Sequence, residues 1–159
     1  MSPLRRGYMI DIAAAAVDRL LVRKTLERYL GSLDDKDRDG IAACFADDSV
    51  SYDDDEPDAL HGGAGVAEWL HRMVAYDATD HSLSTVRIEI DGDTATARGY
   101  VMATLHQGGE GVGRVQVRGI DDKGDLVRVD GSGWTINRRL YKPTMQYDAL
   151  SQPKVLDKG

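Results

Sequence analysis

Apolar residues near the start of the chain recur at every third or fourth position, which is the spacing of a helix with one buried face. The pattern predicts an amphipathic helix over about residues 11–32. Gly31 and the polar cluster at residues 34–37 mark its end. Its apolar positions are Val17, Leu20, Leu21, Leu26, Tyr29, Leu30 and Leu33.

A short second helix is predicted after this cluster, with Asp37 as its N-cap, because an Asp side chain accepts hydrogen bonds from exposed backbone N–H groups. Ile41 and Phe45 would form its buried side. Residues 49–53 are typical of a strand, and a Gly-rich stretch at residues 61–65 leads into a third helix. The apolar face of this third helix comprises Val66, Trp69, Leu70 and Met73.

Beyond residue 80 the hydrophobic period changes from that of helices to the alternation of strands. An Asp-Gly-Asp turn at residues 91–93 is a strong hairpin signal, and no clear period follows Pro143. Helices followed by an antiparallel meander predict an α+β fold, in which the long helix lies across the concave face of a curved sheet and leaves a conical pocket. The predicted strands are residues 81–90, 94–106, 114–119, 126–129 and 134–141.

Composition and net charge limit the kinds of molecule that this chain is expected to bind. The 159 residues suit a single domain, with a core over about residues 11–142 and a C-terminal tail over 143–159. A net charge of -7 with dispersed acids argues against nucleic acid and anionic membrane surfaces, which require concentrated basic patches. No apolar run approaches the roughly 20 residues of a membrane span, and Cys44 has no partner for an internal disulfide. We expect a cytoplasmic protein that takes a hydrophobic small molecule.

The candidate chemistry is proton transfer by side chains. Tyr29, Asp34, Tyr52 and Asp53 interrupt or adjoin apolar faces, and His81 opens a strand. An imidazole near neutral pH can accept a proton, and a neighbouring carboxylate would fix its tautomer. The four histidines lie at least ten residues apart and no cysteine pair is present, so we expect neither a metal nor another cofactor.

The order of elements and several phrases of sequence resemble the SnoaL-like branch of the nuclear transport factor 2-like superfamily, over about residues 14–142. The resemblance implies a cystatin-like α+β barrel with a conical pocket. It does not by itself fix an activity, because this fold hosts dehydratases, isomerases, polyketide cyclases, epoxide hydrolases and non-catalytic binders. The phrases that carry the resemblance are residues 28–41, 45–50, 80–81, 87–98 and 126–136.

One pattern within this superfamily is that of scytalone dehydratase, the bile acid dehydratases and hexachlorocyclohexane dehydrochlorinase. These enzymes are similar in using an Asp after the first helix to orient a His on a later strand, and the matching residues here are Asp34 and His81. The Tyr of the bile acid enzymes matches Tyr29. Scytalone dehydratase has a second catalytic His, and its position is occupied by Val101.

A second pattern is that of ketosteroid isomerase, in which a Tyr, an Asp base and a protonated Asp act together. Tyr29 and Asp53 match the first two positions. The third falls at Asp122 or Asp125, because Lys123 and Gly124 leave the register open by a residue or more. Tyr52 and Asp53 alternate across a strand, so only one of them should face the pocket.

The sequence therefore favours a cofactor-free lyase or isomerase of dehydratase type, acting on a cyclic substrate such as a polyketide, steroid or terpenoid. His81 would be the base, Asp34 would orient it, and Tyr29 would bind or protonate oxygen. A SnoaL-like cyclase, an isomerase using Asp53, and a non-catalytic ligand-binding or dimeric interaction module stay open as alternatives. A homodimer through the outer face of the sheet is also expected. The expected pocket walls are Tyr52, Trp69, Met73, Val101 and Asp125.

Overall fold

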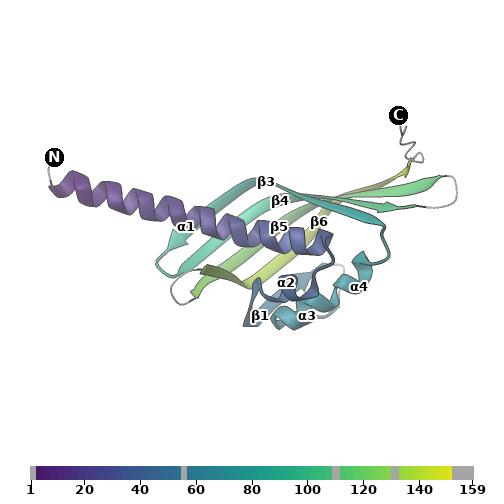
Figure 1. Ribbon diagram of the computed structural model, residues 1–159, viewed down its shortest axis with the longest axis horizontal. Coiled ribbons are helices and arrows are strands. Elements are labelled where there is room, and N and C mark those ends of the chain that lie inside the picture. The colour runs from purple at the N-terminus through teal and green to yellow at the C-terminus, as the bar shows by residue number, and fades with distance from the viewer. Residues whose placement is uncertain (1–2, 55–56, 109–111, 130–132, 152–159) are drawn as a thin grey trace, which may run out of the picture.

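The computed structural model describes residues 3–54, 57–108, 112–129 and 133–151, and within these the side chains from Ile12 onward. Short helices and a long one precede a set of long strands (Figure 1). The helices are α1 (Pro3–Asp34), α2 (Arg38–Ala42), α3 (Gly62–Glu68) and α4 (Leu70–Met73). The strands are β1 (Phe45–Asp53), β2 (Leu60–His61), β3 (Ala78–Asp91), β4 (Thr94–Gln107), β5 (Gly113–Val129) and β6 (Gly133–Ser151).

The strands form one six-stranded sheet in the order β2-β1-β6-β5-β4-β3. Neighbouring strands are antiparallel except β1 and β6, which run parallel. Helix α1 crosses one face of the sheet, α2 and α3 lie beside β1, and α4 leads from α3 toward β3 (Figure 1). The curved open sheet with N-terminal helices confirms the predicted α+β, cystatin-like class.

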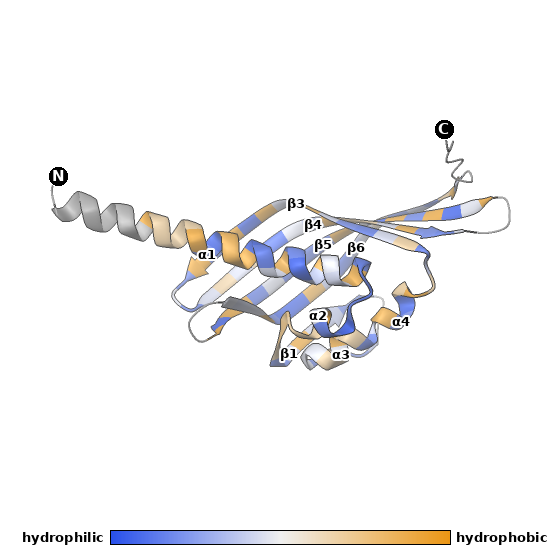
Figure 2. Ribbon diagram, in the orientation of Figure 1, coloured by the Kyte–Doolittle hydropathy of each residue, from blue (hydrophilic) through white to orange (hydrophobic). Residues whose placement is uncertain are grey.

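Helix α1 packs through the predicted stripe, because its buried residues keep the spacing of three and four. It begins at Pro3, earlier than the predicted start, and its first turns extend beyond the sheet (Figure 1). Hydrophobic and hydrophilic segments alternate along the part of α1 that crosses the sheet (Figure 2). Val17 and Leu20, predicted to be buried, are exposed, whereas Asp18 between them faces the sheet and binds Arg128 of β5. The buried positions are Val22, Leu26, Tyr29, Leu30 and Leu33.

The short helices follow local signals. Asp37 caps α2 as predicted, since its carboxylate accepts a hydrogen bond of 2.9 Å from the backbone N–H of Gly40. Gly40 is needed at that position because a Cβ there would collide with the Asp37 carboxylate. The third predicted helix is split at Trp69 into α3 and α4.

The strands are longer than predicted. The hairpin between β3 and β4 is confirmed, with Gly92 at φ 57° in its turn. The segments 114–119 and 126–129 belong to one strand, β5, and β6 continues past Tyr141 to Ser151. Both faces of β6 are mostly exposed after Tyr141, so the sequence has no buried alternation there to reveal a strand. Between the predicted strands, residues 109–111 and 130–132 lie outside the described residues.

A bulge in β6 decides which of its residues face inward. Leu126 of β5 pairs with Ile136, whereas the preceding residue, Asp125, pairs with Arg138, so Asn137 is the extra residue on β6. The alternation changes phase there. Arg139 is consequently buried, whereas Arg138 faces outward.

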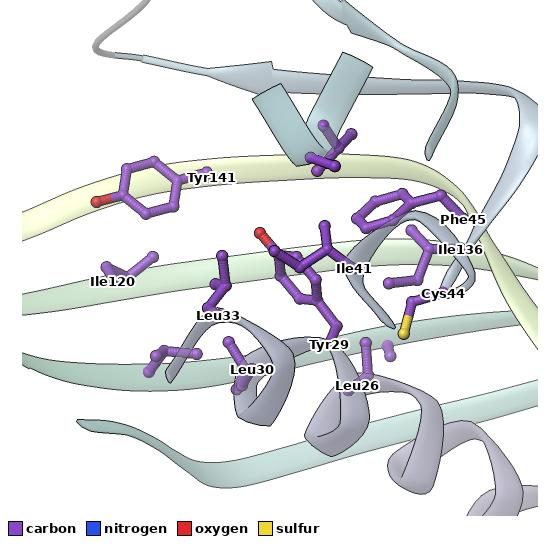
Figure 3. Packing of buried hydrophobic residues seen from close by; sticks show 14 of the residues in the cluster. Leu26, Tyr29, Leu30, Leu33, Ile41, Cys44, Phe45, Ile120, Ile136 and Tyr141 are labelled. Carbon is purple, nitrogen blue, oxygen red and sulfur yellow. The ribbon is translucent and has the colours of Figure 1, made fainter. Parts of the chain in front are cut away.

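The core lies between α1, α2 and the inner face of the sheet (Figure 3). Tyr29 packs edge-on against Phe45 with ring centroids 5.1 Å apart, and Ile41 and Ile136 are almost completely buried beside them. Among the described residues, no helix is long and apolar enough to cross a membrane.

Candidate active site

Asp34 and His81 meet where the end of α1 lies against the start of β3. The Nδ1 atom of His81 is 2.6 Å from Oδ1 of Asp34, and the backbone N–H of His81 donates to Oδ2 at 3.0 Å. Both carboxylate oxygens of Asp34 therefore bind His81, and the two contacts fix the imidazole in position and orientation. The side chain of His81 is only 8% exposed, against 24% for Asp34.

The environment of Asp34 keeps it ionised. Burial alone would raise its pKa, but the hydrogen bonds from the ring and backbone of His81 outweigh burial and lower the pKa of Asp34 below its ordinary value. An ionised Asp34 accepts the proton of Nδ1–H, a tautomer assigned from this hydrogen bond. That tautomer leaves Nε2 of His81 with a lone pair that can take a proton.

His81 borders a small cavity of about 30 Å³ between α1, α4 and the sheet. Three of the predicted wall residues, Trp69, Met73 and Val101, line it. A volume of this size holds a water molecule or two rather than a ring, so a cyclic ligand needs side chains such as Met73 to move. The other lining residues are Tyr29, Leu30, Leu33, Ala103, Leu105, Arg118, Ile120, Arg139 and Tyr141.

Tyr29 is the phenol that α1 contributes to this cavity. It is 3% exposed. Burial raises the pKa of its hydroxyl to about 12, although the neighbouring cation of Arg139 acts to lower that pKa. The hydroxyl therefore stays protonated at neutral pH and can donate a hydrogen bond.

Arg139 is a site residue that the sequence analysis missed. Its guanidinium carbon lies 4.8 Å from the ring centre of Tyr29 and 5.4 Å from that of Tyr141. Its Nε is 2.9 Å from Oδ1 of Asp122, although the N–H is not aligned with that oxygen, so the contact is an ion pair. Burial alone would lower the pKa of Arg139, but Asp122 and the two phenols raise it, so the side chain remains a cation. The bulge at Asn137 is the reason that Arg139 rather than Arg138 faces inward, and a bulge leaves no simple signal in the sequence.

Of the candidate acids of the isomerase pattern, Asp53 and Asp122 face inward and Asp125 faces outward. Asp53 is 9% exposed and lies close enough to raise the pKa of Tyr29, but it does not line the cavity. Asp122 is 8% exposed, and burial raises its pKa despite the pull of Arg139. Asp122 rather than Asp125 therefore faces inward.

Two residues that were predicted to line the pocket lie outside it. Tyr52 is 43% exposed beneath the guanidinium of Arg138, with 5.5 Å between the guanidinium carbon and the ring centre. Asp125 has a half-exposed side chain 3.9 Å from Arg138. Both lie on the outer face, because Asp53 and Asp122 take the inward positions of their strands.

A buried helix-to-sheet cavity with a His–Asp pair at its wall defines a small α+β domain of the cystatin-like class. The chain belongs to the SnoaL-like domain family, which matches residues 14–140. No curated protein matches the chain.

Solved structures share this fold. A candidate scytalone dehydratase from Novosphingobium aromaticivorans is 21% identical, with a TM-score of 0.73 over 87% of this chain and 91% of that one. A candidate aromatic ring hydroxylase from the same organism is 24% identical, with a TM-score of 0.71 over 86% and 94%. Hexachlorocyclohexane dehydrochlorinase from Novosphingobium barchaimii is 17% identical, with a TM-score of 0.67 over 84% and 94%. At these identities the likeness establishes the fold.

The arrangement can perform acid–base chemistry with protein side chains. An oriented imidazole lies at one wall of the cavity, and protonated donors from Tyr29 and Arg139 are also part of its lining. No group of three or more His, Cys, Asp or Glu suited to a metal ion occurs among the residues that the structure describes.

Proposed function

We propose that this protein is a lyase or isomerase of dehydratase type, in which His81 is the general base. The observation that carries the proposal is the 2.6 Å contact between Nδ1 of His81 and Asp34 at the wall of a buried cavity. An adjacent carboxylate stabilises the imidazolium that forms when Nε2 takes a proton.

The reaction would begin with removal of an acidic proton from carbon by Nε2 of His81. Negative charge then develops on the substrate oxygen, which Tyr29 and the cation of Arg139 would stabilise from the cavity wall. The imidazolium of His81 would then return the proton, either to the departing hydroxyl group, which leaves as water, or to a second carbon, which moves the double bond. General base catalysis of this kind contributes on the order of 10²- to 10⁴-fold.

The proposed substrate is a cyclic, largely apolar molecule, because leucines, Ile120, Trp69 and Met73 dominate the lining. The names of two fold neighbours, a candidate scytalone dehydratase and a dehydrochlorinase, support an elimination. A polyketide cyclase is a mechanistic neighbour, since ring closure by aldol addition also begins with proton abstraction.

A non-catalytic binding module is the second candidate. Val101 at the position of the second catalytic His of scytalone dehydratase favours it, and the small cavity of about 30 Å³ favours a dimeric interaction module over a ligand-binding one. An isomerase using Asp53 is weaker, because Asp53 does not line the cavity.

Proton exchange tests the proposal without a known substrate. Wild-type protein would be incubated in D₂O with a panel of cyclic β-hydroxy ketones and α,β-unsaturated cyclic ketones, and NMR would follow both deuterium incorporation and product formation. We expect exchange or elimination with at least one ketone and its loss in His81→Ala. His61→Ala, at an exposed site, is the matched control. A correctly folded His81→Ala protein with wild-type turnover would exclude His81 as the base, and failure of every ketone to exchange would favour the binding module.

A further inference from the structure

The turn that ends α1 has a lysine at the position where helices commonly have glycine. The backbone N–H of Asp37 donates to the carbonyl of Ser32 at 2.9 Å. The backbone N–H of Lys36 donates to the carbonyl of Leu33 at 3.3 Å. Together these contacts form a Schellman motif, in which one residue adopts the left-handed conformation. That residue is Lys36, with φ at 59°, and a side chain is strained in this conformation, whereas glycine is not.

The side chain of Lys36 reaches from the end of the helix to β3. Its Nζ donates to the hydroxyl of Thr79 at 3.1 Å and to the backbone carbonyl of Asp34 at 3.5 Å. Both acceptors are neutral oxygens, and Lys36 forms no ion pair with a residue that the structure describes. Ordering a lysine side chain costs conformational entropy. The strained position therefore supplies a cation held beside the Asp34–His81 pair.

Thr79 connects this cation to the pair. It lies two residues before His81, so both side chains are on the same face of β3. A hydroxyl has one proton, so Thr79 accepts from Lys36 and turns its own proton toward another acceptor. Burial acts to raise the pKa of Asp34, whereas the contacts with His81 and then a hydrogen bond from Thr79 lower it. The carboxylate of Asp34 is therefore the acceptor.

The four residues form one chain of hydrogen bonds from the end of α1 to the imidazole. Lys36 donates to Thr79, and Thr79 donates to Asp34. On its other side Asp34 accepts from the ring and the backbone N–H of His81. Hydrogen bonds in such a partly buried chain polarise one another. Three donors also leave the carboxylate little freedom to rotate.

We propose that Lys36 is a positioning residue for the reaction. Through Thr79 it fixes the carboxylate of Asp34, and this carboxylate holds His81 in the tautomer whose Nε2 can take a proton. The inference rests on the function proposed above, in which His81 is the base. Lys36 does not line the cavity, so it acts on the base and not on the substrate. This role accounts for a lysine where the backbone favours glycine.

The tautomer of His81 can be measured without a substrate, by nitrogen-15 NMR of histidine-labelled protein. We expect the wild type to hold the proton on Nδ1. Thr79→Val keeps the shape of the side chain and removes its hydroxyl, so it should give a mixture of tautomers, and Thr79→Ser should keep the wild-type spectrum. Lys36→Met should change the spectrum in the same direction as Thr79→Val. Lys24→Met is the matched control, because Lys24 is an exposed lysine of the same helix.

Stability and proton exchange should change in opposite directions in Lys36→Gly. Glycine removes the strain of the left-handed conformation, so the urea midpoint should rise. Deuterium exchange of the ketones in the panel above should slow about 10-fold in Lys36→Gly and in Lys36→Met, as is typical when a residue that orients a functional group is lost. Lys24→Met should keep the wild-type rate. A residue that only stabilises the fold would not separate the two measurements in this way.

Wild-type exchange rates in both Lys36 variants would overturn the inference, as would an unchanged His81 spectrum in Thr79→Val. A lower urea midpoint for Lys36→Gly would also overturn it, because the lysine would then serve the fold. The two proposals can fail separately. If the wild type exchanges no ketone, the proposed function fails, and the His81 spectrum alone judges the effect of Lys36 on the ring.

Discussion

Asp34 binds His81 through both carboxylate oxygens, at 2.6 Å to the ring and 3.0 Å to the backbone N–H. It fixes the ring plane and the tautomer, and it supplies a negative charge that a protonated ring requires. The same contacts lower the pKa of Asp34, so the pair is linked to folding stability.

We expect Asp34→Asn to fold, to keep some of the ring contact and to lose most of the turnover, because an amide lacks the orienting charge. The pKa of Asp34 is lowered on folding, so its stabilisation is present at neutral pH and is lost as the pH falls through the folded-state value. Urea unfolding of both proteins from neutral to acidic pH measures this. The wild type should lose its advantage over Asp34→Asn in acid, and a constant difference would contradict the linkage.

Tyr29 links folding stability to pH in alkaline solution, as Asp34 does in acid. Its pKa is raised from 10.0 to about 12, mainly by burial, so the folded protein holds the proton at pH values where the unfolded chain has released it. Its contribution to stability is complete below pH 10 and declines as the pH rises toward 12. The loss is on the order of 3 kcal/mol across that interval, since each tenfold change in proton affinity is about 1.4 kcal/mol.

The prediction is that Tyr29→Phe removes this part of the alkaline destabilisation. Ultraviolet titration of phenolate should also lose a transition near pH 12, whereas substituting the exposed Tyr100 should leave that transition in place. Turnover by Tyr29→Phe should fall if the hydroxyl acts on developing charge. A phenolate transition for Tyr29 near the ordinary value would show that the ring is less buried than in the structure.

At the scale of elements, the predictions hold for α1 and β3 and fail for β6. The helix stripe of α1 and the alternation along β3 follow from residue spacing, so the Asp34–His81 pair was predictable with the family resemblance. The phase change at Asn137 was not, because strict alternation from Ile136 would point Arg138 inward. The far part of β6 was missed because its side chains are exposed, and its pairing depends on β5 rather than on its own sequence.

The bulge leads to a prediction about the buried ion pair that it creates. Arg139→Leu should destabilise the protein by about 3–5 kcal/mol, because Asp122 remains buried without its cation. Arg138→Leu, one position away on the exposed side, should change the free energy of unfolding by less than about 0.5 kcal/mol. Urea denaturation measures both. The double variant Arg139→Leu with Asp122→Leu should recover much of the loss, and no recovery would show that Arg139 stabilises the fold by packing rather than by charge.

At the scale of the whole molecule, the outer face of the sheet carries a group of exposed apolar side chains. Val101 lines the cavity, so its neighbours Tyr100 and Met102 point to the opposite face, where they are 42% and 40% exposed. Met102 pairs across Gly119 with Met145, which is 48% exposed. Contiguous exposed apolar groups on a sheet are typical of a protein interface.

We predict that a second copy of the chain covers this outer face, giving a homodimer at micromolar concentration. Met102→Glu should dissociate it, because two carboxylates would be buried in a symmetric interface without partners. Val74→Glu is the control, since Val74 is 64% exposed beside α4, away from the outer face of the sheet. Light scattering after size exclusion should give twice the 17.4 kDa chain mass for the wild type and the control, and the single mass for Met102→Glu. A monomeric wild type would refute the dimer, and a dimeric Met102→Glu would move the interface to another surface.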